Sequence, residues 1–327
     1  IIRISNKLQQ SFNFSTDGEY SIEIDPRGID ESLIESLTIA RFNRISLGVQ
    51  DFDQEVQNAV NRVQSFKQTK EVIELSRKNG FESISIDLIY GLPRQSKETF
   101  KRTLERVKEL RPDRISLFNY AHLPELFKPQ RRIDINELPS SSEKLNIFQY
   151  SLEYLIEMGY IYIGMDHFAL PDDPLAIAQS KGNLYRNFQG YSTHSGCDIV
   201  GLGLSSIGQV ADSFSQNEKS LDKYYQAIDS GQLPIIKGQI VSQDDKIRKT
   251  LIMELICHFE VSISSLEERY SIEFTKYFAD SLERLAEMQD DGLIELKSDS
   301  IKVMDRGRLL VRNICMVFDN YLKKSSA

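Results

Sequence analysis

Short β-branched segments alternate with helical patterns between residues 17 and 165, and this order constrains the fold more than any other feature. We expect strands at 19–24, 44–50, 82–90, 114–120 and 160–164. Parallel strands need long crossover connections, usually helices, whereas antiparallel strands can be joined by short hairpins. Strands that alternate with helices therefore predict an α/β fold with a parallel sheet.

The phase of these strands separates polar from apolar side chains. In the second segment, Ile45, Leu47 and Val49 alternate with the polar or small residues at 46, 48 and 50, and the third segment repeats the pattern. Successive side chains point to opposite faces of a sheet, so one face is apolar and the other polar. A doubly wound sheet buries both faces and reads as continuous apolar runs. The split favours a partial barrel with a polar interior, and an antiparallel sheet with one solvated face is the alternative.

The chain divides by composition into three predicted regions. Residues 1–170 form the partial barrel, and residues 171–240, rich in turn-forming residues, form a loop-rich extension that completes the site. Residues 241–327 carry helical stripes followed by two short alternating runs, which resembles a winged helix. A DNA reader is usually basic, but residues 240–327 hold 13 Lys or Arg and 16 Asp or Glu. We therefore expect a packing or lid domain rather than a DNA-binding domain.

Charge and cysteine content exclude several classes of protein. The net charge of −8 argues against nucleic acid or an anionic membrane as a partner. No apolar run approaches the roughly 18 residues that span a bilayer. Three cysteines, Cys197, Cys257 and Cys315, have neither metal-site nor disulfide spacing, which favours a reducing cytoplasm and buried or half-buried thiols.

Polar residues lie at or near the ends of the predicted strands, where a βα barrel gathers its active site. They are Glu23, Gln50, Asp87 and the stretch 119–122. A carboxylate inside a barrel is costly unless it is paired or binds a ligand. Glu23 and Asp87 are therefore functional candidates, and the alternative is a structural ion pair with Arg44 or Arg62.

Histidines and basic residues give weaker signals. His122, His167 and His194 have no metal-ligand spacing, and a lone histidine more often makes ordinary hydrogen bonds, so we predict no metal site. A basic cluster at 128–132 has the chemistry to bind substrate carboxylates, although a solvated charged surface is the more common explanation.

A series of motifs follows one family's order along nearly the whole chain. They are SIEIDP (21–26), GVQDF (48–52), VNR (60–62), IDLIYGLP (86–93), FNYAHLP (118–124), GMDHFA (164–169), RNFQGY (186–191) and RNICM (312–316). In these motifs the chain resembles the oxygen-independent coproporphyrinogen III oxidases, radical S-adenosylmethionine (SAM) enzymes of haem biosynthesis.

The resemblance implies a partial (βα)6 barrel, a [4Fe–4S] cluster and two SAM molecules. It also implies a cytoplasmic, monomeric enzyme that decarboxylates two propionates of coproporphyrinogen III, with an electron donor and an electron acceptor of unknown identity. By position, Glu23 matches the contact to the cluster-bound SAM. Residues that match the lining of the second SAM site are Gln50, Arg62, Asp87, Ala121 and Ile207.

One departure from the family concerns the cluster. Its Cys-x-x-x-Cys-x-x-Cys motif and glycine-rich SAM turn are absent from these residues. At about 30 residues per βα unit, we expect roughly 60 or more residues to be missing from this chain, which would then bind no cluster and be inactive. The alternative functions are a haem-trafficking relative without oxidase activity and a winged-helix regulator.

Overall fold

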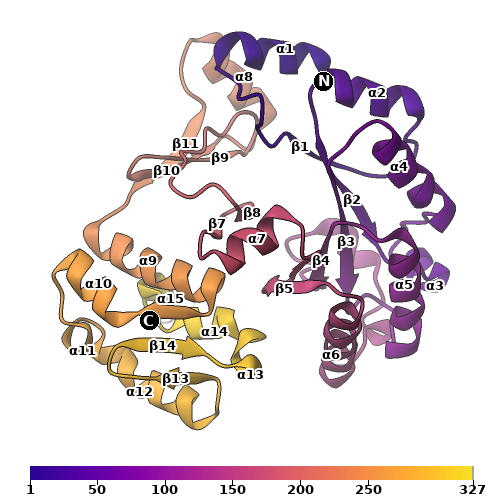
Figure 1. The fold of residues 1–327 in the computed structure, drawn as a ribbon. Coiled ribbons are helices and arrows are strands. Elements are labelled where there is room, and N and C mark those ends of the chain that lie inside the picture. The colour runs from indigo at the N-terminus through magenta and orange to yellow at the C-terminus, as the bar shows by residue number, and fades with distance from the viewer. Residues whose placement is uncertain (326–327) are drawn as a thin grey trace. The chain divides into compact units, whose positions relative to one another are not determined.

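The computed structural model describes residues 1–325 and divides into two compact units, residues 1–177 and the residues from 178 onward. Each unit is described by itself (Figure 1). Among residues 1–325, no helix combines the length and the apolar character that crossing a membrane requires.

The first unit is built on one open six-stranded sheet in the order β1-β2-β3-β4-β6-β5. Strands β1 to β4 are parallel, as the sequence predicts, and β6 is antiparallel to both of its neighbours. The strands are β1 (Ser21–Ile24), β2 (Arg44–Gln50), β3 (Ser83–Tyr90), β4 (Arg114–Asn119), β5 (Ile161–Gly164) and β6 (His167–Ala169). The α/β class is confirmed, and within the described residues the sheet does not close into a full barrel.

Strand β6 was not predicted, because it has three residues and follows β5 after a turn of two. Met165 occupies this turn in the left-handed region, with φ of 53°. The chain reverses there, and β6 pairs with both β5 and β4. Alternation over three residues is too short to separate a strand from a loop in the sequence.

Helices lie to one side of β1 to β4 in Figure 1. Serine N-caps begin two of them: Ser65 and Ser96 each accept a hydrogen bond from the third residue of the helix, in capping boxes. The helical elements of this unit are α1 (Ile2–Ser11), α2 (Glu31–Ile39), α3 (Gln54–Ala59), α4 (Phe66–Lys78), α5 (Lys97–Leu110), η1 (Lys128–Arg132), η2 (Ile135–Glu137) and α6 (Ser141–Glu157), with α7 (Pro174–Ser180) at its end.

The apolar face of the sheet forms the core with these helices, as the strand phase predicts. Its residues Ile45, Leu47, Val49, Ile84, Ile86, Leu88, Ile115 and Leu117 are at most 1% exposed. From α5, the buried stripe of Phe100, Leu104 and Val107 packs in the same cluster. Burial of this face leaves the opposite, polar face free for ligands.

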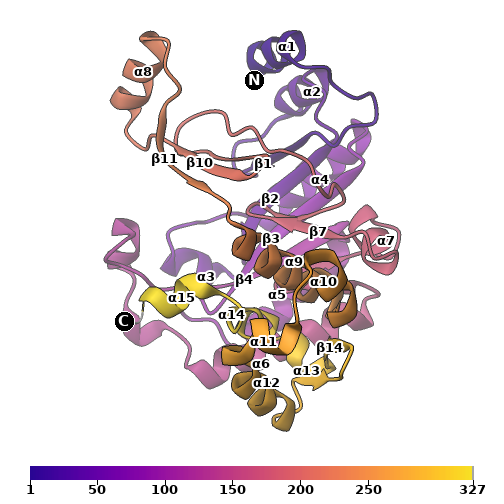
Figure 2. The ribbon, with the colours of Figure 1, turned by 90° about the vertical axis from the view of Figure 1, so that its left-hand side faces the viewer.

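The second unit begins with two small antiparallel sheets. Strands β7 (Tyr185–Asn187) and β8 (Gly190–Ser192) pair as a hairpin. The other sheet has the order β11-β10-β9, and Figure 2 shows β11 leading from α8 toward α9. Its elements are β9 (Ile207–Val210), β10 (Ser213–Asn217), α8 (Leu221–Asp229) and β11 (Ile235–Ile240).

The remainder of the second unit is helical with a small three-stranded sheet, which confirms the predicted winged-helix-like pattern. The expected hairpin forms from β13 (Ile294–Leu296) and β14 (Ser300–Val303), and β12 (Glu260–Ser262) adds a third strand. The helices are α9 (Gln243–His258), α10 (Ile263–Tyr270), α11 (Phe274–Tyr277), α12 (Ala279–Asp290), α13 (Asp305–Arg308), α14 (Val311–Met316) and α15 (Asn320–Ser325).

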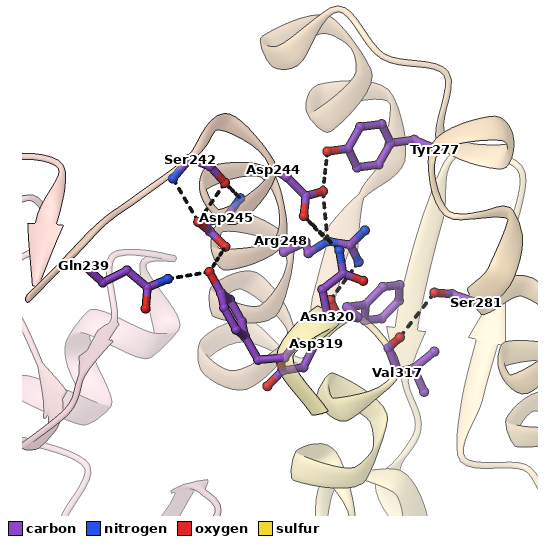
Figure 3. Close-up of polar contacts among 12 residues, drawn as sticks. Gln239, Ser242, Asp244, Asp245, Arg248, Tyr277, Ser281, Val317, Asp319 and Asn320 are labelled. Atoms are coloured by element: carbon purple, nitrogen blue, oxygen red, sulfur yellow. Dashed lines mark hydrogen bonds and ion pairs between the residues drawn. The ribbon is translucent and has the colours of Figure 1, made fainter. Parts of the chain in front are cut away.

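A polar network at the start of α9 fixes the segment that leads into α15 (Figure 3). The Asp244 carboxylate accepts hydrogen bonds from Arg248 Nε at 2.9 Å, Tyr277 Oη at 2.5 Å and Asn320 Nδ2 at 2.9 Å. Arg248 also donates through Nη1 to the Phe318 carbonyl at 2.9 Å. Three segments distant in sequence therefore meet at one carboxylate.

Candidate functional site

Polar side chains form a row across the polar face of the first unit's sheet. Glu23 of β1 is in register with Ser46 of β2, and Asp87 of β3 is in register with Ser116 of β4, which in turn faces His167 of β6. Ser46 Oγ lies 3.4 Å from Asp87 Oδ2 and donates to it. The two predicted carboxylates therefore share one face.

Asp87 has a strongly shifted ionisation. Burial raises the pKa of its carboxyl to about 6, hydrogen bonds from Ser116 and Ser46 act against the rise, and the charge of Glu23 adds to it. Glu23 itself is exposed. The ion-pair alternative is not what the structure shows, because Arg44 pairs with Glu19 and Arg62 with Asp25.

Gln50 ends β2 at a break in the strand register, with a left-handed φ of 67°. Because of this break, Gln50 does not follow the regular alternation of side chains along β2. Beside it, Gly48 leaves room that a larger residue would fill: a Cβ there would lie 3.0 Å from Gln50 Nε2 and 3.2 Å from Arg62 Nη2. Gly48 thus lets Gln50 and Arg62 approach the strand closely.

Two contacts hold the Arg62 guanidinium, and its Nε makes no hydrogen bond within the described residues. Its Nη2 donates to the Gly48 carbonyl at 2.8 Å, and its Nη1 lies 3.1 Å from Asp25 Oδ2. Its Nε is buried and has no hydrogen-bond partner among the described residues. A buried donor without a partner costs free energy. The pKa of Asp25 is lowered to about 2, first by Arg27 and then in part by Arg62.

Gln50 and Arg62 line a common cavity of about 470 Å³. Its other lining residues come from the end of α3 and the residues after it, from β3 and the loop after it, from the loop after β4, and from η1 and the residue after it: Ala59, Val60, Asn61, Ile89, Leu92, Tyr120, Pro129, Gln130, Arg132 and Ile133. Arg132 is the one member of the predicted basic cluster that takes part. The volume lies in the range of small-molecule sites, roughly 300–1,000 Å³.

The other predicted site residues lie outside this lining. Glu23 and Asp87 belong to the row on the sheet, and the carbonyl of Ala121 accepts a hydrogen bond from the lining residue Gln130 at 3.1 Å. Ile207 lies on β9 in the second unit, and its role stays a prediction. The sequence analysis did not identify Gln130. A glutamine within a basic stretch is too common a pattern to mark a site residue.

No metal site occurs among residues 1–325, where no group of three or more His, Cys, Asp or Glu residues could hold an ion. Cys257 and Cys315 are buried as predicted, and burial raises the pKa of each thiol to about 12. Cys197 is exposed, contrary to the expectation of a buried or half-buried thiol. It lies in the loop between β8 and β9, where little chain is available to cover it.

Comparisons with known proteins identify the family of this chain. The model of the radical SAM superfamily matches residues 1–107, and that of the HemN C-terminal domain matches residues 241–310. The oxygen-independent coproporphyrinogen III oxidase of Pseudomonas aeruginosa is 50% identical over 98% of this chain and 70% of its own length, and that of Escherichia coli is 46% identical over 100% and 71%. This chain belongs to the oxygen-independent coproporphyrinogen III oxidase family.

A solved structure supports the family assignment. Coproporphyrinogen III oxidase (HemN) from Escherichia coli, described as a radical SAM enzyme, matches with a TM-score of 0.95 at 47% identity, over 98% of this chain and 74% of that one. Radical SAM enzymes use SAM and a [4Fe–4S] cluster, so the family implies both groups. The match of residues 241–310 to the HemN C-terminal domain speaks against the winged-helix regulator, and nothing in the comparisons favours the haem-trafficking alternative.

Proposed function

We propose that this protein takes part in the conversion of coproporphyrinogen III to protoporphyrinogen IX, and that the cavity beside Gln50 and Arg62 holds SAM. The observation that carries the cofactor assignment is Arg62, which lines a cavity of about 470 Å³ together with Gln50. A guanidinium suits the methionyl carboxylate of SAM, because arginine binds carboxylates with paired donors. The residues present therefore fit this ligand.

The two carboxylates on the polar row complement the cationic parts of SAM, its sulfonium and ammonium groups. Asp87, with a pKa of about 6, is mostly ionised at neutral pH. Its charge is only partly solvated, so it attracts a cation more strongly than a carboxylate in bulk water does. We assign Asp87, together with Gln50, Arg62 and Ala121, to the second SAM site and Glu23 to the cluster-bound SAM.

The chemistry of the reaction comes from the cofactors: SAM bound to a reduced cluster supplies a radical that removes a hydrogen atom from a substrate propionate. For each propionate, carbon dioxide and one electron would then leave, which would give the vinyl group. The hydrogen atom would stay with the radical, so the two propionates together would pass two electrons to the acceptor. Residues of this chain bind and orient the ligands and exclude water. The three cysteines are not gathered into a metal-binding group within residues 1–325, and we assign no cluster ligand among them.

The other partners follow from the chemistry. Coproporphyrinogen III carries four carboxylates, and Arg132 places a second guanidinium at the same cavity. An electron donor must reduce the cluster and an acceptor must take the last electron, and we leave both unnamed. We further propose that the protein works in the cytoplasm as a monomer.

An anaerobic assay tests the proposed activity. A form of the enzyme that carries the [4Fe–4S] cluster, here called the holoenzyme, is incubated with coproporphyrinogen III, SAM and a reductant, and protoporphyrin is measured by fluorescence after oxidation of the product. Arg62→Gln should lower turnover at limiting SAM by more than tenfold (about 1.4 kcal/mol). The proposal is wrong if the holoenzyme consumes no coproporphyrinogen III, or if Arg62→Gln leaves the dependence on SAM unchanged.

A further inference from the structure

Asp51 follows Gln50 directly and is 1% exposed. Three donors converge on its carboxylate: the backbone N–H of Asp53 at 2.7 Å, Thr103 Oγ1 at 2.5 Å and Gln95 Nε2 at 2.5 Å. Burial raises the pKa of Asp51, while these donors act against the rise by stabilising the ionised form. A buried carboxylate is costly unless it is satisfied in this way.

Gln95 connects this carboxylate to the neighbouring loop. The Nε2 atom of Gln95 also donates to the Ile89 carbonyl at 2.8 Å, and its Oε1 accepts from the backbone N–H of Leu92 at 2.8 Å. Ile89 and Leu92 both line the cavity that Gln50 and Arg62 share. One side chain therefore joins the loop after β2 to the loop after β3.

A third contact fixes the segment that leads to Arg62. Gln57, which is 5% exposed, donates through Nε2 to the carbonyls of Asp51 at 2.8 Å and Gln64 at 2.7 Å, and its Oε1 accepts from the Gln64 backbone N–H. Residues 59–62 of the cavity wall lie between these two anchor points. The backbone of Asp51 thus restrains this part of the wall.

We propose that Asp51 and Gln95 are positioning residues for SAM. They touch no ligand, and they hold the ends of β2 and β3 and the loop after β3, which carry Gln50, Ile89 and Leu92, at the spacing the ligand needs. The proposal rests on the assignment of SAM to this cavity. Binding groups must be held to within a fraction of an ångström by packed and hydrogen-bonded neighbours. Loss of the Asp51 anchor lets the two loops separate, which weakens SAM binding before it unfolds the sheet.

The test measures SAM affinity by isothermal titration calorimetry, with the fold followed by circular dichroism. In Asp51→Asn an amide NH₂ group replaces one carboxylate oxygen. This group is a donor and would face the donor of Gln95 or Thr103, so one hydrogen bond is lost. We expect the affinity for SAM to be at least about tenfold weaker. Asp113→Asn is the matched control. Asp113 Oδ2 accepts the Ile84 backbone N–H at 2.8 Å at the other end of the sheet, so its loss should reduce stability and leave SAM affinity unchanged.

If Asp51→Asn does not fold, a second pair of variants tests whether the anchoring of Asp51 affects SAM binding. Thr103→Val removes one anchor of Asp51 from α5, outside the cavity lining, and should weaken SAM binding, whereas Thr103→Ser keeps the hydroxyl and should restore it. Folded Asp51→Asn or Thr103→Val protein that binds SAM as tightly as the unsubstituted protein overturns the inference. Absence of SAM binding by the unsubstituted protein would instead overturn the proposed function, and the inference with it.

Discussion

Glu23 and Asp87 lie on the same face of the sheet, two strands apart, and the charge of Glu23 adds to the effect of burial in raising the pKa of Asp87 to about 6. A protein that needed Asp87 only for stability would gain from a neutral residue there. The proposed cationic ligand would give a charge on this face a function.

Asp87→Asn should therefore stabilise the free protein at pH 7.5. The folded pKa of Asp87 lies above its ordinary value of 3.8, so its ionisation opposes folding, and stability falls as the pH rises from about 4 through 6. The amide can keep a hydrogen bond with Ser46 or Ser116. We expect a gain of about 1–2 kcal/mol in the free energy of unfolding, measured by urea denaturation. A loss of stability at pH 7.5 would contradict the assignment of Asp87 as a strained, desolvated carboxylate.

SAM affinity should depend on pH through the same residue. Above pH 6 the ionised Asp87 attracts the cationic ligand, and below pH 6 a proton must be displaced before SAM binds. We expect affinity to be constant from pH 7 to 8 and to fall by up to about tenfold per pH unit below 6. Calorimetry in several buffers checks this, and Asp87→Asn should remove the dependence. An unaltered pH profile in that variant would assign the titration to another group.

The two arginines that contact Asp25 should differ in their effect on SAM binding. Arg62 Nη1 lies 3.1 Å and Arg27 Nη2 2.6 Å from its Oδ2, but only Arg62 lines the cavity. Arg62→Lys keeps the charge and loses the fork of planar donors, so we expect SAM affinity to fall at least about tenfold. Arg27→Lys is the matched control and should bind SAM as the unsubstituted protein does. Equal losses in both variants would trace the effect to Asp25.

The network in Figure 3 should control the stability of the second unit. Burial raises the pKa of Asp244, and the hydrogen bond from Arg248 lowers it. The net result is a pKa below the ordinary value of 3.8. Asp244 therefore contributes stability above about pH 4, which is lost as the pH falls through its folded pKa. Asp244→Ala should cost about 1–2 kcal/mol and speed hydrogen exchange in residues 317–321.

The control for this network is Asp305→Ala, since the Asp305 side chain is 98% exposed and lies 3.6 Å from Arg308. We expect a change below about 0.5 kcal/mol, because isolated surface ion pairs contribute little. If hydrogen exchange at 317–321 is the same in Asp244→Ala and Asp305→Ala, the network does not hold the C-terminal segment.

The sequence predicted the sheet of the first unit well because its strand phase is strong. Ile45, Leu47 and Val49 alternate without interruption, and the face opposite to them is the one that carries Asp87. Strand β6 could not be predicted from the sequence, because its three residues depend on the turn at Met165 and on pairing with β4. Secondary structure that depends on tertiary pairing leaves no periodic signal in so short a segment.

The candidate site was predictable in part. Gln50 and Arg62, which the resemblance places at a SAM site, line one cavity, and their role in binding SAM stays a prediction. The supporting residues Asp51, Gln95 and Gln57 are hydrophilic types, and nothing local in the sequence marks them as buried. Their burial follows from contacts over as many as 52 residues, which single-sequence periodicity does not record.

The most direct test of the account is a crystal structure of the protein with SAM bound. The account predicts electron density for SAM in the cavity lined by Gln50 and Arg62, with its carboxylate at the Arg62 guanidinium and its cationic groups toward Asp87. Density for SAM on another surface, with this cavity holding only water at saturating ligand, would contradict it.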